Sequence, residues 1–550
     1  MTSPSSGRGR RAIGLALIPL AGGALVGLSL PPIGVWPLGV VGVALLVSAL
    51  YGRRLPVRVA LGMLAGVGQF FISCAWALQF NTAGYIVLAI VEAVFYAVAC
   101  ALVPPGRGRF PVAVGALTLA EWARQTWPFG GLPLGGIALG QANGPLAPTA
   151  RLGGSLLVAG VTVLAGTSLA ALCTPVLTQW AHRRRASPEG ASSRSASHQA
   201  HRRRAATEGA ASRSAGRAAA AAALGGVVGI VVVVGLVVVA RVFPPSSTSA
   251  SNAHGSTIRV AVVQGGGRRG LSQLQVPASV VFQAALKETA HVPAGTSLIV
   301  WPEDVVALSR ALAGSADEAI LASVARRHHA TLVAGVTEPV GTTRFRNEIV
   351  AFAPSGRLVA EFEKVHRVPF GEYVPWRGFF SHFASLEDVP RDAIPGRGTG
   401  MIATPAGRFA LLVSYEVFFA DRGRSGVRAG GEVVLVPTNT SSYSNDQAPA
   451  QEIAASRLQA LEEGRYVLQA APTGYSAVID PAGDVLARTA LSRPAVLVAS
   501  VPLLQGSDLF LKAGNLPVLL AGVLALCGGW GAALSRRERR RRHRRRWPSR

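Results

Sequence analysis

Long apolar stretches separated by short polar or basic segments occupy both ends of the chain. A helix needs about 20 residues to cross the hydrocarbon of a bilayer, and eight stretches reach or approach that length. The fifth is the weakest, because it is short and ends with Glu121 and Arg124. We expect Glu121 to snorkel toward the interface rather than line a lipid entrance. The pattern predicts about eight membrane spans, at 12–30, 33–51, 57–79, 84–104, 110–124, 152–176, 218–241 and 514–534.

The segment from about 256 to 510 has a different pattern. Short runs rich in β-branched residues alternate with helical stretches at 315–328 and 448–464, and turn signals lie at 354–356 and 481–483. This alternation is typical of an α/β domain. The runs expected as strands are TIRVAVVQ, TSLIVWPE, TLVAGV, NEIVAFA, RFALLVSYE, EVVLVPTN and AVLVAS.

Positive charge orients the predicted spans. The chain has 54 Lys+Arg and a formal net charge of +26, but the 256–510 segment is balanced. With a cytoplasmic N-terminus, the arginine-rich segments all fall on the cytoplasmic side and the α/β domain lies outside the cytoplasm. We therefore expect a multi-pass plasma-membrane protein with both termini in the cytoplasm. The basic segments lack interleaved aromatic residues that stack on bases, so anionic membrane lipids are their expected partners and nucleic acid is not.

Two basic segments are of low complexity. HRRRASPEGASSRSAS from His182 recurs as HRRRAATEGAASRSAG from His201, which predicts a disordered cytoplasmic linker over 181–217. The tail at 535–550 is expected to fix the orientation of the last span. The predicted order is a membrane domain at 1–180, the linker, a span at 218–241, the α/β domain at 256–510, a span at 514–534 and the tail.

The α/β segment contains no cysteine. The four cysteines of the chain, Cys74, Cys100, Cys173 and Cys527, all fall within predicted spans. A disulfide framework, a zinc–thiolate site and a thiol nucleophile are therefore excluded from the α/β domain. We expect no metal and no other cofactor.

Two strand ends of the α/β domain carry charged candidates. Glu303 in VWPED follows a strand and an indole, where partial desolvation favours a general base, although Pro302-Glu303-Asp304 is equally typical of a helix start. Lys364 follows a hairpin strand and has the charge to stabilise an oxyanion, although most such lysines are simply solvated. His366 has no second ligand at zinc spacing, so we expect it to be a structural or surface residue rather than a metal ligand.

Ser414 ends a third strand, in the stretch LLVSYEVFFADR. A serine in this place usually only closes a strand. The sequence around it lacks the G-x-S-x-G pattern and has no histidine at an obvious triad spacing. The residues alone therefore give little support to a serine hydrolase.

The order of these three residues resembles the Glu-Lys-Cys triad of the carbon–nitrogen hydrolase (nitrilase) superfamily. Predicted spans on both sides of such a domain narrow the resemblance to the apolipoprotein N-acyltransferase family, and the richness in Arg, Ala and Gly is similar to that of actinobacterial members. The resemblance covers nearly the whole chain apart from the linker and the tail. The matching strings are VWPED, KVHRVPFGEYVP, VSYEVFF, VVLVPTN, SRLQALEEGRYVLQAAPTGYSAVIDPAGDV and WPFGGLPLGGIALGQ.

The resemblance implies a fold and a reaction. The fold is a polytopic helical membrane domain with an extracytoplasmic, nitrilase-like α/β/β/α sandwich docked over it. The reaction transfers a fatty acyl chain from a phospholipid to the nucleophile, and then to the N-terminal amine of a diacylglyceryl-cysteine lipoprotein. Carried over by residue, the resemblance makes Glu303 the base, Lys364 the oxyanion-side cation and position 414 the nucleophile. The family motif positions near the site or supporting it are Glu372, Tyr415, Glu416 and Arg465.

Ser414 departs from the family, which has cysteine at this position. A thiol ionises near pH 8.5 and is intrinsically nucleophilic, whereas a serine needs a strong, well-placed base. The nearby string NTSSYSNDQ also lacks the family's common Asn-Asp-x-Trp form. Three interpretations remain open. They are a serine-based N-acyltransferase, a catalytically silent paralogue that binds lipoproteins or scaffolds another membrane enzyme such as a polyprenyl-phosphate mannose synthase, and, with least support, an amidase-like hydrolase.

Overall fold

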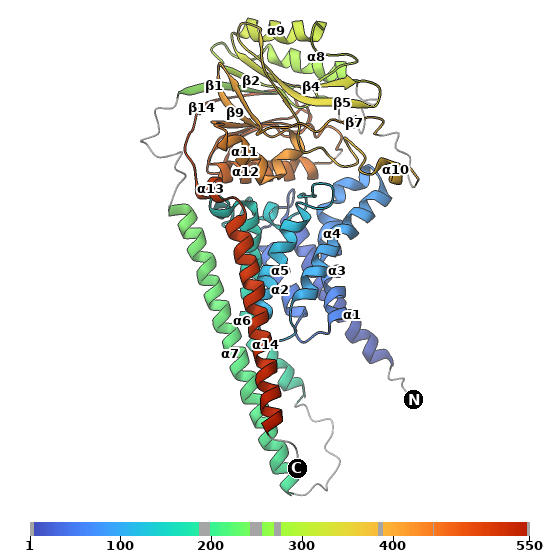
Figure 1. The fold of residues 1–550 in the computed structure, drawn as a ribbon, viewed down its shortest axis with the longest axis vertical. Coiled ribbons are helices and arrows are strands. Elements are labelled where there is room, and N and C mark those ends of the chain that lie inside the picture. Colours follow the sequence, from blue (N-terminus) through green and yellow to red (C-terminus); the bar gives the residue numbers. More distant parts are fainter. Residues whose placement is uncertain are drawn as a thin grey trace.

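The computed structural model describes residues 5–185, 198–242, 256–268, 277–382, 389–443 and 445–546. An α/β sandwich lies over one end of a helical bundle (Figure 1). The start of the first helix and the end of the last helix both lie at the other end of the bundle, away from the sandwich.

Helices occur at all eight predicted spans, although they differ in length and polarity. Within the described residues, five helical segments are long and apolar enough to cross a membrane: Leu55–Ser73, Thr82–Leu102, Ala147–Thr174, Ala218–Val242 and Leu516–Ser535. Two further apolar helices, at Gly14–Ser29 and Pro37–Ala49, are shorter. The helices of the bundle are α1 (Ser5–Ser29), α2 (Pro37–Ala49), α3 (Leu55–Ser73), η1 (Ala75–Gln79), α4 (Thr82–Leu102), α5 (Arg109–Arg124), η2 (Ile137–Gln141), η3 (Ala147–Thr149), α6 (Ala150–Arg185), α7 (His198–Val242), and, after the sandwich, α13 (Leu509–Ala513) and α14 (Leu516–Arg546).

The linker expected to be disordered over 181–217 is helical in its described parts. α6 continues to Arg185 and α7 begins at His198, whereas 186–197 lie outside the described residues. Alanine, arginine and glutamate have high helix propensity, so these segments extend the apolar helices next to them. The described parts of this segment are therefore helical in backbone, and its disorder stays a prediction.

Two mixed sheets form the centre of the α/β domain. One has the strand order β14-β1-β2-β4-β5-β6, with β3 beside β4 and β7 beside β5, and the other has the order β13-β12-β11-β10-β9-β8. Neighbours β1, β2 and β4 run parallel, as do β9, β10 and β11. The strands are β1 (Thr257–Gln264), β2 (Leu298–Val300), β3 (Val306–Ala307), β4 (Thr331–Val340), β5 (Arg344–Phe352), β6 (Leu358–Glu363), β7 (Asp392–Ala393), β8 (Met401–Thr404), β9 (Gly407–Leu411), β10 (Val433–Pro437), β11 (Val467–Ala470), β12 (Ala477–Ile479), β13 (Val485–Arg488) and β14 (Ala495–Pro502).

Apolar side chains fill the space on both sides of each sheet. Val260 and Leu298 of the first sheet share a core with Leu411 and Leu435 of the second, so the sheets pack face to face. Helices cover the two outer faces and complete the expected α/β/β/α sandwich, with α11 and α12 nearest the bundle (Figure 1). The covering helices are α8 (Ala278–Thr289) and α9 (Ala316–His328) on the first sheet, and α11 (Ala420–Arg428) and α12 (Gln447–Glu463) on the second.

α12 joins the sandwich to the bundle through side-chain amides. Gln447 donates to the carbonyl of Ile72 at 2.8 Å and accepts from the N–H of Trp76 at 2.7 Å. One turn later, Gln451 donates to the carbonyl of Ser73 at 2.8 Å. These carbonyls belong to the last turn of α3, where a helix leaves its own acceptors without partners. The docking of α12 satisfies them.

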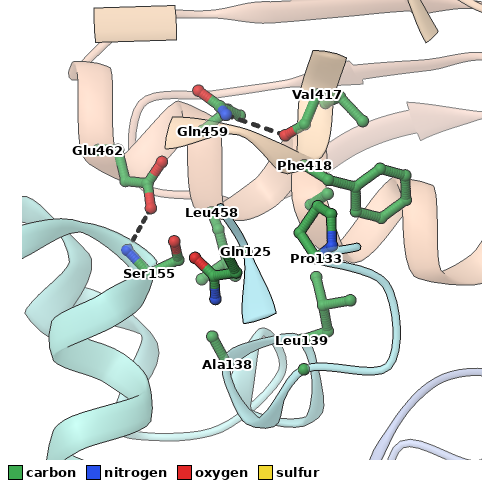
Figure 2. Close-up of a pocket in the computed structure, with 12 residues that line it drawn as sticks. Gln125, Pro133, Ala138, Leu139, Ser155, Val417, Phe418, Leu458, Gln459 and Glu462 are labelled. Carbon is green, nitrogen blue, oxygen red and sulfur yellow. Dashed lines mark hydrogen bonds between the residues drawn. The ribbon is translucent and has the colours of Figure 1, made fainter. Parts of the chain in front are cut away.

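A second contact joins the end of α12 to α6 (Figure 2). The backbone N–H of Ser155, just after a bend in α6, donates to the carboxyl group of Glu462. Nearby, Gln459 donates to the carbonyl of Val417 at 2.9 Å. The cavity among these residues has a volume of about 20 Å³, close to the space that one water molecule needs. The sandwich and the bundle therefore pack closely here.

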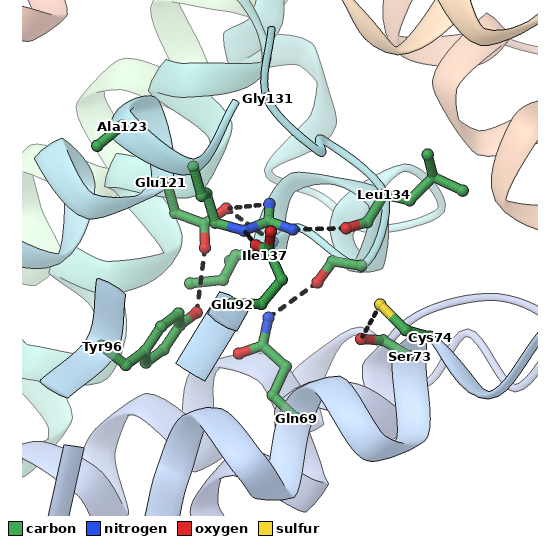
Figure 3. Close-up of polar contacts among 12 residues, drawn as sticks. Gln69, Ser73, Cys74, Glu92, Tyr96, Glu121, Ala123, Gly131, Leu134 and Ile137 are labelled. Carbon is green, nitrogen blue, oxygen red and sulfur yellow. Dashed lines mark hydrogen bonds and ion pairs between the residues drawn. The ribbon is translucent and has the colours of Figure 1, made fainter. Parts of the chain in front are cut away.

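A charged cluster is buried in the bundle, beside the loop that follows α5 (Figure 3). Arg124 donates to Glu92 at 2.7 Å and to the carbonyl of Leu134 at 2.5 Å, and its Nη1 lies 3.6 Å from Glu121. Glu121 also accepts from the hydroxyl of Tyr96 at 3.1 Å. The charged side chains are buried, and a buried charge is costly unless it is paired. The expectation that Glu121 snorkels was therefore wrong, because Arg124 and Tyr96 hold it inside.

The contact of Glu462 with α6 predicts a pH dependence of stability. Burial raises the pKa of Glu462 to about 8, so the folded protein holds a proton that the unfolded chain releases above about pH 4.5. The stability from this group is complete below that pH and is lost as the pH rises to about 8, by up to about 1.4 kcal/mol per pH unit. We expect Glu462→Gln, which keeps an acceptor but does not titrate, to reduce the fall in Tm between pH 5 and 8. Thermal unfolding in detergent measures this.

A matched control is Asp484→Asn, the corresponding change at an exposed position directly before β13. It is expected to keep the wild-type dependence of Tm on pH. An equal fall in Tm for Glu462→Gln and the wild type would show that the carboxyl at the contact with Ser155 does not titrate in this range.

Candidate active site

Glu303 and Lys364 meet in the interior of the α/β domain. Glu303 lies in a turn after β2, and Lys364 directly follows β6. Lys364 Nζ donates to Glu303 Oε1 at 2.8 Å. The two residues are only 4% and 2% exposed. Glu303 therefore does not begin a helix, and Lys364 is not a solvated surface lysine.

Glu372 and Asn347 complete this charged group. Lys364 Nζ also donates to Glu372 Oε1 at 2.8 Å. Asn347 Nδ2 donates to both carboxylates, at 2.9 Å to Glu303 and at 2.8 Å to Glu372. Sequence analysis treated the run NEIVAFA only as a strand and missed Asn347. The strand offers no clear signal for it, because β5 also carries Arg344, Arg346 and Glu348.

Burial and mutual attraction set the protonation of this group. Burial raises the pKa of Glu303, and the attraction of Lys364 offsets that effect only in part. Burial alone would lower the pKa of Lys364, but Glu303 and Glu372 raise it above its usual value. Lys364 thus stays charged, while Glu303 gains affinity for a proton. These properties suit a cation that stabilises an oxyanion and a general base.

Close backbone packing fixes the turn that carries Glu303. The N–H of Gly335 in β4 donates to the carbonyl of Pro302 at 3.0 Å, and a Cβ added at Gly335 would lie 2.5 Å from Glu303 Cα. Asp304 has a φ of 55°, and its carboxylate accepts from the hydroxyl of Thr337 at 2.7 Å. Only glycine fits at position 335, so β4 acts as a rigid support for the candidate base.

Ser414 occupies the corner between β9 and the short helix η6 (Ser414–Phe418). β9 ends at Leu411, so the last residues of the expected strand RFALLVSYE are helical instead. Ser414 has a φ of 51°, in the left-handed region, and is partly exposed, whereas Val413 before it is buried. A strained corner of this kind presents the nucleophile in enzymes with the G-x-S-x-G pattern, which this sequence lacks.

Glu416 joins the corner at Ser414 to the segment that follows β6. Its Oε1 accepts from the N–H groups of Val365 and His366, each at 3.0 Å. Its Oε2 accepts from the N–H of Val413, also at 3.0 Å. One buried carboxylate thus clips the chain just after the candidate lysine to the chain just before the candidate nucleophile.

Two of the polar residues from the sequence analysis have structural contacts. His366 stacks on Phe419 with ring centroids 4.3 Å apart, and burial together with Arg422 lowers its pKa to about 4. It is therefore a neutral packing residue, as predicted. Arg465 donates to the carbonyl of Gly506 at 2.8 Å and to other backbone carbonyls around the end of α12. These contacts anchor a loop and do not involve Glu303.

Aromatic residues connect the site to the bundle. The hydroxyl of Tyr415 donates to the carbonyl of Gly131, in the loop after α5, at 2.7 Å. The ring of Tyr443 lies 5.6 Å from that of Trp76 and 5.3 Å from that of Phe80, both in or beside η1. The residue next to Ser414 is therefore bonded directly to the bundle.

Two family models match the chain at complementary positions. The model described as the apolipoprotein N-acyltransferase N-terminal domain matches residues 22–168 of the bundle. The model described as carbon-nitrogen hydrolase matches residues 259–506, which form the sandwich.

Several known proteins are similar to the chain. The apolipoprotein N-acyltransferase of Mycolicibacterium smegmatis is 30% identical over 371 residues, which is 65% of this chain and 57% of that relative's length. The one of Azotobacter vinelandii is 28% identical over 95% of this chain and 96% of its own length. The crystal structure of Saccharomyces cerevisiae Nit3, a member of branch 10 of the nitrilase superfamily, covers 46% of this chain and 93% of its own, at 22% identity and a TM-score of 0.34. With both family models matched in this order, the chain belongs to the apolipoprotein N-acyltransferase family.

Proposed function

We propose that the protein transfers a fatty acyl chain from a phospholipid to the N-terminal amine of a diacylglyceryl-cysteine lipoprotein. The observation that carries the proposal is the buried pair of Glu303 and Lys364 beside the strained corner at Ser414. The corner and the pair lie in a domain docked on apolar helices. The names of the similar proteins favour the same reaction.

In the first step, Ser414 Oγ attacks the ester carbonyl carbon of the phospholipid, and Glu303 takes the hydroxyl proton. The carbonyl oxygen becomes an oxyanion, which the ammonium of Lys364 stabilises. When the intermediate collapses, the ester C–O bond breaks and the lysophospholipid alkoxide receives the proton from Glu303. The acyl chain remains on Ser414 as an oxyester.

In the second step, the free α-amine of the lipoprotein attacks the oxyester. Glu303 takes a proton from the attacking nitrogen and returns it to Ser414 Oγ as the oxyester bond breaks. Lys364 keeps its proton throughout, because two carboxylates surround it. The product is an amide, and the free hydroxyl of Ser414 is restored.

Serine makes both steps harder than cysteine would. Its hydroxyl ionises much less readily than a thiol, and an oxyester resists attack by an amine more than a thioester does. Two features work in its favour. The raised pKa of Glu303 makes it a stronger base than an exposed carboxylate, and the left-handed backbone holds Ser414 at the corner before substrate arrives.

The remaining candidate residues support this arrangement. Glu372 holds the second side of Lys364, and Glu416 fixes the corner against the segment after β6. Tyr415 ties the corner to the loop after α5. We assign Arg465 a more distant role, anchoring the end of α12.

We further propose that the chain crosses the membrane eight times. The arginine clusters lie at 8–11, 181–217 and 535–550, on helix ends that point away from the sandwich where the structure describes them. Loops rich in arginine stay in the cytoplasm, so the domain at 256–510 is extracytoplasmic and both termini are cytoplasmic. Phospholipid then reaches the site from the outer leaflet.

Serine at position 414 favours a second function. A paralogue that retains the buried pair but lacks a thiol would bind diacylated lipoproteins, or hold another membrane enzyme, without transferring an acyl chain. A single acyl-transfer assay distinguishes the two functions, because only the first one yields an acylated lipopeptide.

Replacing the candidate nucleophile separates these functions. We expect the purified wild type to acylate a diacylglyceryl lipopeptide in the presence of phospholipid, and Ser414→Ala to form no product, because alanine cannot carry the acyl chain. Ser414→Cys is expected to be at least about tenfold faster, since a thiolate is the better nucleophile. Mass spectrometry of the lipopeptide measures the product. Product from Ser414→Cys alone would reject serine catalysis and favour the binding function.

Glu303→Gln tests the candidate base without removing its hydrogen bonds. The amide oxygen still accepts from Lys364 and Asn347 but takes no proton, so we expect the acylation rate to fall by about 10²–10⁴. Glu361→Gln, at an exposed position of β6, is the matched control and is expected to retain the wild-type rate. A Glu303→Gln rate within about threefold of the control, at the same Tm, would exclude Glu303 as the general base.

A further inference from the structure

A buried carboxyl group, Glu452, lies near the candidate site but is outside its triad. It is on α12 and is 2% exposed. The hydroxyl of Thr438 donates to its Oε1, and Gln469 Nε2 lies 3.4 Å from its Oε2. Ser456 donates to Gln469 Oε1 at 2.6 Å, which fixes the amide so that its NH₂ group faces Glu452. The carboxyl group is thus held in one place by both α12 and the second sheet.

The topology of the second sheet places this carboxyl group at the edge that carries the nucleophile position. β9 and β10 are neighbours, run parallel and pair Leu411 with Leu435. Ser414 follows the carboxyl end of β9 and Thr438 follows the carboxyl end of β10, so both lie at the same edge of the sheet. The residue that donates to Glu452 and the candidate nucleophile therefore share that edge.

The ionisable groups that face Glu452 come from three other segments. Glu303 after β2 and Lys364 after β6 both act on it electrostatically. Tyr443, in the loop before α12, also interacts electrostatically with Glu452, Lys364 and Glu303. On its own helix, the nearest buried acid further along is Glu462, about 15 Å away at 1.5 Å per residue. Glu452 therefore interacts with the candidate site rather than with the contact to α6.

We propose that Glu452 is a positioning residue of this site, whose carboxyl group sets the local charge at Glu303 and at position 414. When Glu452 is neutral, the charged groups around the site are Glu303, Lys364 and Glu372, together with Glu416 and its partner Arg422. When it is ionised, one more negative charge opposes the formation of an anion at position 414. The consequence for acyl transfer rests on the proposed function, whereas the effect on local charge does not.

The protonation of Glu452 makes this effect depend on pH in an accessible range. Burial raises the pKa of Glu452 to about 8, although the hydrogen bond from Thr438 acts in the opposite direction and lowers it. The group is therefore mostly protonated at neutral pH and gains its charge as the pH passes 8. Loss of the Thr438 hydroxyl would keep Glu452 neutral to a higher pH.

The test uses a thiol as a reporter of charge at position 414. In the full-length Ser414→Cys protein in detergent, the rate of alkylation by iodoacetamide is followed from pH 6 to 10. Mass spectrometry of the peptide that contains position 414 separates this thiol from the four native cysteines. We expect Glu452→Gln in this background to lower the apparent pKa of the thiol by about one pH unit, because a nearby negative charge is removed.

Thr438 supplies a second variant that leaves Glu452 in place. Thr438→Val in the Ser414→Cys background is expected to shift the thiol pKa in the same direction, because Glu452 stays neutral for longer. Thr438→Ser keeps the hydroxyl and is expected to leave the profile unchanged. Profiles of Glu452→Gln and Thr438→Val that both superimpose on their parent would overturn the proposal. A shift in either one that Thr438→Ser does not reproduce supports it, even where the other variant fails to fold.

The alkylation readout is independent of acyl transfer. If the wild type forms no acylated lipopeptide but the thiol pKa shifts, the proposed function fails and the role of Glu452 stands. If acyl transfer occurs and the profiles superimpose, the role of Glu452 fails alone.

Discussion

Lys364 is buried between two carboxylates, and much of the α/β domain is arranged around that constraint. Removing an ammonium ion from water costs several kcal/mol, and one carboxylate offsets this only when the remaining polar groups are also bonded. Glu303 and Glu372 supply the charge, and Asn347 ties the two carboxylates together. The turn at Glu303 is pressed onto Gly335, so the carboxylate of Glu303 is held in the interior. A charged lysine and a carboxylate with raised proton affinity follow from this enclosure.

α12 fixes the α/β domain to the membrane domain through hydrogen bonds. One face carries Gln447 and Gln451, whose amides bind the end of α3, while Glu452 and Ser456 turn toward the second sheet. A helix with polar groups on two faces has few alternative ways to pack, because every misplacement leaves a buried donor or acceptor without a partner. The sandwich is thereby fixed in orientation over the bundle, with the site on the side where apolar helices end.

Local patterns predicted the elements well, and long-range contacts explain what they missed. The run TIRVAVVQ is β1, and the helix expected at 315–328 is α9, because alternation and helical periodicity are properties of neighbouring residues. Glu303, Lys364 and Glu372 were found from motif positions. Asn347 and the Arg124 cluster were not, since their partners lie on other strands and helices and only the fold brings them together. The composition of the linker suits both a solvated coil and a helix that continues its neighbour, and its described parts are helical.

The left-handed backbone at position 414 is a property of the turn and does not depend on whether the side chain carries oxygen or sulfur. Serine and cysteine both have an unbranched side chain with one heavy atom beyond Cβ, so both bear nearly the same conformational cost there. The clip made by Glu416 also involves only backbone N–H groups and is insensitive to the side chain at 414. Exchanging sulfur for oxygen at this corner therefore changes the free energy of folding very little. Serine and cysteine at this position therefore differ in their chemistry rather than in their fit to the scaffold.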